Sequence, residues 1–250
     1  MNLISEIEQI ALETWPAEEM VDCDGWVLRA SRGTTSRANS VWPNQDNGRL
    51  SLTQKIEAAE SFYQSRNLTV KFQVNPISKP VNLAQTLLAK GYKAVGHVVV
   101  QTAVISSRQP PINPQLLFIH SDRLTAGWLK FHQDGNQYSE EETAVRGGIM
   151  RRITTPVVYL EAELNGETVG IGSAILMNGW LGILNMRTAD AVKRQGVGTA
   201  VLTKLLQWGQ QKGATKTFLQ VVAKNQPAQA LYRQFGYETV YGYHYLVAGD

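Results

Sequence analysis

The sequence predicts an α/β protein with mixed sheets, divided into two domains of similar architecture. Three observations predict this class: a proline-rich break near the middle, alternating helix-period and strand-period segments on both sides of it, and an internal repeat. The break is S-S-R-Q-P-P-I-N-P, Ser106 to Pro114, where three prolines in five residues exclude helix interiors and central strands. We therefore expect domains over residues 1–107 and 115–250, joined by a linker over 108–114.

Segments after the break alternate in period. We expect a strand, two helices and then three strands, over Gln115–Ile119, Asp122–His132, Glu140–Ile153, Val157–Leu164, Glu167–Leu176 and Trp180–Thr188. The dipeptide Asn165-Gly166 readily adopts the positive φ angles of a tight hairpin turn. The three strands are therefore predicted to form an antiparallel meander.

The period then changes to that of a helix. From Val197 to Gln211 the apolar residues form the stripe of an amphipathic helix, and Gly213 supplies its C-terminal stop. A strand, a helix closed by Gly236 and a final strand follow, over Thr217–Val222, Asn225–Phe235 and Tyr237–Val247.

The two halves of the chain echo each other. Leu87–Val100 and Tyr232–Tyr245 both read as a helix closed by Gly-Tyr and followed by a strand. Upstream, K-F-Q-V at Lys71–Val74 echoes F-L-Q-V at Phe218–Val221, and the helical segment Leu52–Arg66 echoes the helix after Gly196. Two copies of one αβ unit are the simplest explanation, and chance similarity between short segments is the alternative.

The composition indicates which kinds of partner and which cellular compartment to expect. The 24 Lys and Arg are scattered among 21 acidic residues, a net charge of +3, which does not favour nucleic acid. A single cysteine, Cys23, excludes an intramolecular disulfide and a thiolate zinc cage, and the four histidines fall at no metal-ligand spacing, so no metal is expected. Met1–Leu12 is unlike a signal peptide, and no apolar run approaches the roughly 20 residues that span a bilayer. We expect a cytoplasmic protein with no membrane partner.

The segment K-R-Q-G-V-G-T-A, Lys193 to Ala200, carries the first chemical signal. It lies between a strand and the amphipathic helix, and its glycines at 196 and 198 let the backbone turn sharply and approach a ligand. The first amides of the helix favour an anion. This predicts a pyrophosphate cradle, which is neither a Walker loop nor a G-x-G-x-x-G fingerprint. The plainer alternative is a tight turn between strand and helix.

A second segment, N-Q-P-A-Q-A-L-Y-R-Q-F-G-Y, Asn225 to Tyr237, follows about 25 residues later. With the cradle, it resembles the GNAT superfamily of acetyl-CoA-dependent N-acetyltransferases from about Gln115 to the end of the chain. The family's motif Q/R-x-x-G-x-G/A is matched by Gln195, Gly198 and Ala200. Its motif N-x-x-A-x-x-L-Y-x-x-x-G-[FY] is matched by Asn225, Ala228, Leu231, Tyr232, Gly236 and Tyr237.

The resemblance implies two GNAT-like domains in tandem, each a central, mostly antiparallel twisted sheet flanked by helices. It also implies acetyl-CoA as co-substrate and direct acetyl transfer to a primary amine, with Tyr232 as general acid for the departing thiolate. The residues implied to hold the cofactor are Met186, Arg187, Thr188, Lys193, Arg194, Gln195, Gly196, Val197, Gly198, Thr199, Ala200, Asn225 and Tyr232. The plainer alternative for Tyr232 is a packed core aromatic residue.

The position where many family members carry the general base differs in this sequence. Many members carry a glutamate on the strand before the cradle, but Trp180–Thr188 contains no carboxylate. Glu161 and Glu163 on the neighbouring strand are alternatives, acting through water, and Glu161 is slightly preferred. Exposed strand carboxylates without a catalytic role are the commoner explanation for either.

The first half resembles a degenerate copy of the same unit. Around Asn47-Gly48-Arg49-Leu50 there is no G-x-G, and Leu87 stands where Tyr232 stands in the second half, so residues 1–107 are expected not to bind CoA. The segment Ser36–Pro43 is read as a strand that either lines an acceptor pocket or is simply half-buried.

Two functions therefore remain open. The first is an active N-acetyltransferase whose first domain shapes the acceptor cleft, and the second is a nonenzymatic acyl-CoA-binding module. A first domain that serves mainly as a homodimer interface is compatible with either. The amine acceptor, small molecule or peptide, cannot be read from the fold or the cofactor motif.

Overall fold

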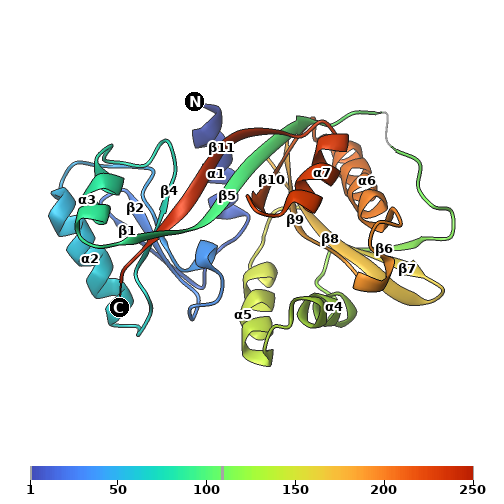
Figure 1. Cartoon of the computed structure of the whole chain (residues 1–250), viewed down its shortest axis with the longest axis horizontal. Coiled ribbons are helices and arrows are strands. Elements are labelled where there is room, and N and C mark those ends of the chain that lie inside the picture. Colours follow the sequence, from blue (N-terminus) through green and yellow to red (C-terminus); the bar gives the residue numbers. More distant parts are fainter. Residues whose placement is uncertain (1, 108–109, 250) are drawn as a thin grey trace. The chain divides into compact units, whose positions relative to one another are not determined.

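The computed structural model describes residues 2–107 and 110–249 of the chain. Arg108 and Gln109, which belong to the predicted linker, lie outside the described residues. The chain forms two compact units (Figure 1). Unit 1 comprises Met1–Val99, Val222–Lys224 and Tyr241–Asp250, and unit 2 comprises Val100–Val221 and Asn225–Val240. The fold is the mixed α/β class with sheets flanked by helices that the sequence predicts.

Unit 1 builds its sheet in the order β1-β2-β3-β4-β11. Strands β1 and β2 form an antiparallel hairpin, β3 runs parallel to β4, and β4 pairs antiparallel with β11. The elements are α1 (Leu3–Glu13), β1 (Glu19–Cys23), β2 (Trp26–Ala30), η1 (Ser36–Ala38), β3 (Val41–Trp42), α2 (Leu52–Gln64), β4 (Lys71–Val74), α3 (Leu83–Ala89), the first part of β5 (Lys93–Val104) and the second part of β11 (Glu238–Val247).

The core of unit 1 is aromatic. Trp26 and Phe72 meet edge to face at 5.7 Å between ring centroids, and Ile56 and Tyr63 of α2 pack on the same cluster. Burying such side chains removes large apolar areas from water, which is the main favourable term in folding. Helix α2 confirms the helix predicted over 52–66.

A buried carboxylate ties α1 to the sheet of unit 1. Glu8 is fully buried and accepts hydrogen bonds from Trp42 Nε1 at 3.0 Å, Asn44 Nδ2 at 3.1 Å and the Tyr241 hydroxyl at 2.5 Å. Burial raises the pKa of Glu8, and these donors oppose that rise. Because Tyr241 lies on β11, the last strand of the chain is bonded directly to the first helix.

The strand predicted over Ser36–Pro43 is wrong for most of its length. Residues Ser36–Ala38 form a 3-10 helix, and only Val41 and Trp42 are a strand. The side chain of Asn39 explains the difference, because its Oδ1 accepts from the amides of Ser31 and Gly33 while its Nδ2 donates to backbone carbonyls. These bonds compete with a strand ladder and fold the segment into a loop.

Unit 2 builds its sheet in the order β5-β10-β9-β8-β7-β6. Pairing from β9 to β6 is antiparallel, and β10 pairs with β9 in parallel. The elements are β6 (Leu117–Ser121), α4 (Ala126–Asn136), α5 (Glu140–Arg151), β7 (Val157–Leu164), β8 (Glu167–Met177), β9 (Trp180–Thr188), η2 (Asp190–Val192), α6 (Val197–Gln211), β10 (Lys216–Val222) and α7 (Gln226–Gln234), with parts of β5 and β11.

The predicted meander is confirmed, but α4 starts later than the pattern suggests. The Ser121 hydroxyl accepts from the amide of Arg123 in a turn, and Thr125 is the N-cap, accepting from the amide of Trp128. The helix ends at Asn136 because Gln137 adopts the left-handed conformation. The helix predicted over Asp122–His132 is therefore shifted by four residues.

Helices cover both faces of the sheet in unit 2 (Figure 1). Gly170 and Gly172 of β8 point towards α6, where a Cβ at Gly172 would lie 2.9 Å from Leu205 Cδ1. Side chains alternate along a strand, so Ile171 points to the face covered by α4. Among the described residues, no helix is long and apolar enough to cross a membrane, and no group of three or more potential metal-binding side chains was found.

Candidate active site

The segment predicted to cradle a pyrophosphate forms the N-terminus of α6. Gly196 is the N-cap in the left-handed conformation with φ 81°, and it offers no side-chain cap to the helix. Space around Gly196 is open, whereas a Cβ at Gly198 would lie 3.3 Å from Leu231 Cδ2 and 3.4 Å from Thr188 Oγ1. The first amides of a helix lack intrahelical partners, so this turn presents donors to an anion.

The cradle is exposed before the helix and becomes buried within it. Lys193, Arg194, Gln195 and Gly196 are exposed, Gly198 and Thr199 are half-buried, and Val197 and Ala200 are buried. Lys193 Nζ pairs with Asp190 Oδ1 at 2.7 Å, and this hydrogen bond lowers the pKa of the Asp190 carboxyl. The charge of Lys193 is therefore shared with Asp190.

Strands β9 and β10 separate next to this turn. Their parallel register runs from Trp180 opposite Lys216 to Ile183 opposite Leu219. Beyond that point β9 continues through Leu184 to Thr188, which includes Met186, Arg187 and Thr188 of the predicted cofactor set. Among the described residues the ladder between β9 and β10 ends at Ile183, so backbone groups of the later half of β9 that face β10 can bond an extended ligand.

An irregularity in β9 marks the point of separation. Asn185 has φ 55°, and the register with β8 shifts between Ile171 and Ser173. The Asn185 side chain donates to Ser173 Oγ at 3.0 Å, and the Ser173 hydroxyl donates to the carbonyl of Leu184 at 3.3 Å. A bulge of this kind re-aims the backbone and side chains of a strand.

Tyr232 lies on α7 with 7% of its surface exposed. Its ring centroid is 5.8 Å from that of Tyr237, and burial raises the pKa of Tyr232 to about 12. The phenol is therefore protonated across the physiological range. Asn225 is exposed and caps α7, since its Oδ1 accepts from the amide of Ala228 at 3.2 Å.

Glu161 is buried, which differs from the exposed strand carboxylate that the pattern suggests. Its Oε1 accepts from the Thr125 hydroxyl at 2.8 Å, and Gly127 of α4 lies beside the carboxylate. Glu161 stands opposite Ile171, and Ile171 stands opposite Arg187. Directly paired residues share a face of the sheet, so Glu161 and Arg187 both point towards α4. Glu163 is half-buried.

Sequence reasoning missed the basic side chains on this same face. His132 of α4, Arg146 of α5 and the side chain of Arg187 act on one another, since both arginines lower the pKa of His132. Their spacing in the chain gives no common period, because each comes from a different element. Arg187 was singled out only for its backbone.

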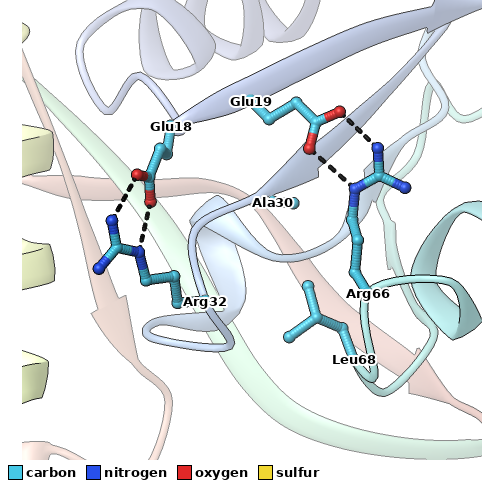
Figure 2. A pocket seen from close by; sticks show the side chains of 6 residues that line it. All are labelled: Glu18, Glu19, Ala30, Arg32, Arg66 and Leu68. Atoms are coloured by element: carbon cyan, nitrogen blue, oxygen red, sulfur yellow. Dashed lines mark hydrogen bonds and ion pairs between the residues drawn. The ribbon is translucent and has the colours of Figure 1, made fainter.

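Unit 1 contains a separate pocket of about 330 Å³, lined by Glu18, Glu19, Ala30, Arg32, Arg66 and Leu68 (Figure 2). Two forked ion pairs frame it. Arg32 contacts Glu18 at 2.9 Å, and Arg66 contacts Glu19 at 2.5 Å. Each guanidinium faces a carboxylate, so the four charges of the rim cancel.

Comparison with known proteins identifies relatives that match almost the whole chain. A family model described as "Probable histone acetyltransferase Rv0428c C-terminal" matches residues 2–246. The "Uncharacterized N-acetyltransferase YobR" of Bacillus subtilis is 29% identical over 251 residues, covering 99% of both chains. The "Probable histone acetyltransferase Rv0428c" of Mycobacterium tuberculosis is 26% identical over 223 residues, covering 87% of this chain and 66% of its own length.

Two solved structures share the fold. A GCN5-related N-acetyltransferase from Kribbella flavida has a TM-score of 0.73 at 14% identity, covering 100% of this chain and 97% of the other. A tandem GNAT protein from the clavulanic acid biosynthesis pathway has a TM-score of 0.62 at 13% identity, covering 79% of this chain and 70% of the other.

The fold and the relatives define the class of the protein, an acyltransferase of the GNAT type. Because the family model spans almost the whole chain, the protein belongs to the Rv0428c C-terminal family.

Proposed function

We propose that the chain transfers the acetyl group of acetyl-CoA directly to a primary amine, at one site in unit 2. The observation that carries this proposal is the convergence of three features in that unit. They are the uncapped N-terminus of α6, the separation of β9 from β10, and the buried phenol of Tyr232. Each suits a different part of the cofactor.

The residues proposed for the cofactor divide by the group they contact. Amides from Gly196 to Thr199 hold the pyrophosphate, with Lys193 and Arg194 as countercharges. The amides of Gln195 and Ala200, which the sequence also suggests, already donate to backbone carbonyls of the chain. The backbone of Met186, Arg187 and Thr188 bonds the pantetheine amides. Asn225, an exposed residue, contacts the same arm through its side-chain amide. The exposure of Lys193–Gly196 supports this arrangement, since the ligand must reach the loop.

The reaction balances with Tyr232 as the proton donor. The neutral amine attacks the thioester carbonyl, and backbone amides of β9 near Asn185 stabilise the oxyanion. As the C–S bond breaks, Tyr232 gives its proton to the sulfur and is reprotonated by the proton that the amine nitrogen loses. A thiol has a pKa of about 8.5, well below that of Tyr232, so protonation of the thiolate by the phenol is unfavourable alone. It is driven by the much more acidic proton that the nitrogen of the product loses to the phenolate.

Glu161 is proposed to remove the proton of the acceptor ammonium through water. Two strand spacings separate β7 from β9, roughly 10 Å, which is too far for direct contact with the amine. The position of Glu161 on the face of Arg187 supports this role. Its hydroxyl contact with Thr125 keeps the carboxylate oriented towards α4.

Unit 1 is proposed to be a degenerate copy without cofactor. Asp24 Oδ2 already accepts from the amides of Arg49 and Leu50, at 3.0 and 2.9 Å, just before α2. A second acetyl-CoA would have to displace this carboxylate. The intact protein is therefore expected to bind one acetyl-CoA.

Calorimetric titration of acetyl-CoA into the intact protein tests the proposal. One site, followed by amine-dependent thiol release in an acceptor screen, is the expected result. Binding without thiol release for any amine would favour the nonenzymatic acyl-CoA-binding module. A protein that does not bind acetyl-CoA would overturn the assignment of the cradle.

A further inference from the structure

Two residues of β9 stand where the register with β8 leaves room for one. Asn185 and Met186 together oppose Gly172, and Asn185 has φ 55°. The sulfur of Met186 lies on the α6 face, 2.8 Å from the position of a Cβ at Gly172. The side chain of Asn185 instead contacts Ser173 of β8 and Met150 of α5. The bulge therefore turns the Asn185 side chain away from α6, towards the face of the sheet on which α5 lies.

Two buried groups hold the carboxamide of Asn185 in one orientation. Its Nδ2 donates to Ser173 Oγ at 3.0 Å and to Met150 Sδ at 3.7 Å, and both of these residues are buried. The Ser173 hydroxyl gives its own proton to the carbonyl of Leu184, and a thioether sulfur can only accept, so both contacts need an N–H donor. The nitrogen of the planar amide is therefore fixed on these two groups, with its oxygen on the other side.

The oxygen of this carboxamide is left for a ligand. Among the described residues, Asn185 Oδ1 has no hydrogen-bond donor, and Asn185 is half-buried whereas its two anchors are buried. The ladder between β9 and β10 ends at Ile183, so Asn185 lies where the two strands have separated. A side chain that is already held in place loses little further freedom when a ligand binds.

The group that this oxygen suits is the amine of the acceptor. The N-terminus of α6 and the side chain of Asn185 lie on opposite faces of the sheet, so cofactor and acceptor can reach the gap beside β9 from different sides. An amide oxygen accepts a hydrogen bond from an N–H group. Because β9 contains no carboxylate, this strand offers the amine a neutral acceptor, which orients the nitrogen without taking its proton.

We propose that Asn185 Oδ1 accepts a hydrogen bond from the acceptor nitrogen and aims its lone pair at the thioester carbonyl, so that the site selects a primary amine over an alcohol. This inference rests on the proposed function. A primary amine has one N–H for Asn185 and a second proton to lose after the attack. An alcohol has a single proton, which cannot both stay on Asn185 and leave the oxygen.

Two thioether analogues of acetyl-CoA test the inference without knowledge of the acceptor. In S-(N-methylcarbamoylmethyl)-CoA, a methyl amide follows the sulfur after one methylene, and S-(methoxycarbonylmethyl)-CoA has an ester oxygen in place of the amide N–H. Each analogue is titrated calorimetrically into the intact protein. The amide is expected to bind about 5-fold more tightly than the ester, the scale of one neutral hydrogen bond.

Variants then assign this preference to one side chain. Asn185→Gly removes the carboxamide and keeps the positive φ angle, which glycine adopts without strain. It should leave the affinity for the ester unchanged and abolish the preference for the amide. Asn178→Gly is the matched control, because Asn178 also has a positive φ, 51°, but is exposed in the turn before β9. That variant should keep the preference. Ser173→Ala, which removes one anchor of the carboxamide, should give an intermediate value.

The outcomes separate a role in binding from a structural one. A purely structural Asn185 would weaken both analogues alike in Asn185→Gly, and that result would overturn the inference. Where Asn185→Gly does not fold, an undiminished preference in Ser173→Ala would overturn it. Acetyl-CoA is titrated first, so a protein that does not bind it overturns the proposed function. Binding of acetyl-CoA without a preference for the amide analogue overturns this inference alone.

Discussion

Two helices of the chain begin in opposite electrostatic states. Before α2, the carboxylate of Asp24 accepts two backbone amides and contacts Lys55 Nζ at 3.1 Å, while Ser51 and Gln54 form a capping box. Before α6, Gly196 provides no side chain and the loop is exposed. The positive end of a helix must meet an anion or a polar partner. Helix α2 finds that anion within the chain, and we propose that α6 leaves the place for the cofactor.

Placing a carboxylate at the start of α6, as Asp24 does before α2, should have the largest effect on cofactor binding. Gly198→Glu places a carboxylate and extra bulk beside Thr188 and Leu231, where even a Cβ is crowded. We expect loss of measurable acetyl-CoA binding by calorimetry. Gln210→Glu adds the same charge at an exposed position of α6 and should bind like the parent. Unchanged affinity in Gly198→Glu would show that the phosphates lie elsewhere.

Removing the charged contacts before α2 should instead lower the stability of the fold. Lys55 is 1% exposed and contacts both Asp24 and Asp46, so Lys55→Met leaves two carboxylates without their cation. The loss expected for a broken buried pair is about 4 kcal/mol in the free energy of unfolding, measured by denaturant titration. The variant should still bind one acetyl-CoA where it is folded. A second binding site in this variant would mean that unit 1 retains a usable cradle.

The proposed acetyl-CoA site next to the start of α6 should need Tyr232 for turnover but not for binding the cofactor. Tyr232→Phe is expected to lower kcat by roughly 10²-fold, the scale of a positioned acid, with acetyl-CoA affinity unchanged. Tyr237→Phe is the matched control, because its hydroxyl bonds Thr217 at 2.8 Å in the core. That variant should lose about 1 kcal/mol of stability and keep its kcat. Equal turnover in Tyr232→Phe and the parent would remove Tyr232 from the mechanism.

The smallest effect concerns the buried imidazole of His132. Burial and two arginines lower the pKa of His132 from its ordinary 6.5 to about 4. Between these values the unfolded chain binds a proton that the native protein does not, so stability is full above pH 6.5 and falls as pH decreases towards 4. At pH 5 the loss relative to pH 8 should be about 2 kcal/mol. His132→Asn should flatten this part of the stability profile, and an unchanged profile would contradict the shift.

Local patterns predicted the elements that carry the proposed cofactor site. The stripe of α6, the alternation of β7 and β9 and the glycines of the cradle are periodic or motif features within single segments, and the helix and strands lie where the sequence places them. The side chain of Asn39 overrode the strand expected around it, because its hydrogen bonds are specific to the folded loop.

Contacts between distant segments could not be predicted. Asp24 accepts from the amides of Arg49 and Leu50 only after the chain has folded, and only then does the charge of Arg187 lower the pKa of His132. The sequence pattern reveals the period of a single helix or strand. It does not show which side chains from three different elements come together. The grouping of His132 with Arg146 and Arg187 therefore needed the structure, although each of these residues was visible in the sequence.

The passage of β11 into unit 1 bears on how the protein is made. Strand β4 pairs with His244–Val247, and Glu8 bonds Tyr241, so the sheet that starts near the N-terminus is completed by residues close to position 247. During synthesis, residues 1–99 emerge from the ribosome with one edge of β4 unpaired and a buried carboxylate lacking its shortest donor. A nascent chain in this state exposes an edge to wrong partners. Faithful biosynthesis therefore depends on the last strand arriving promptly, and early translational termination would damage both units.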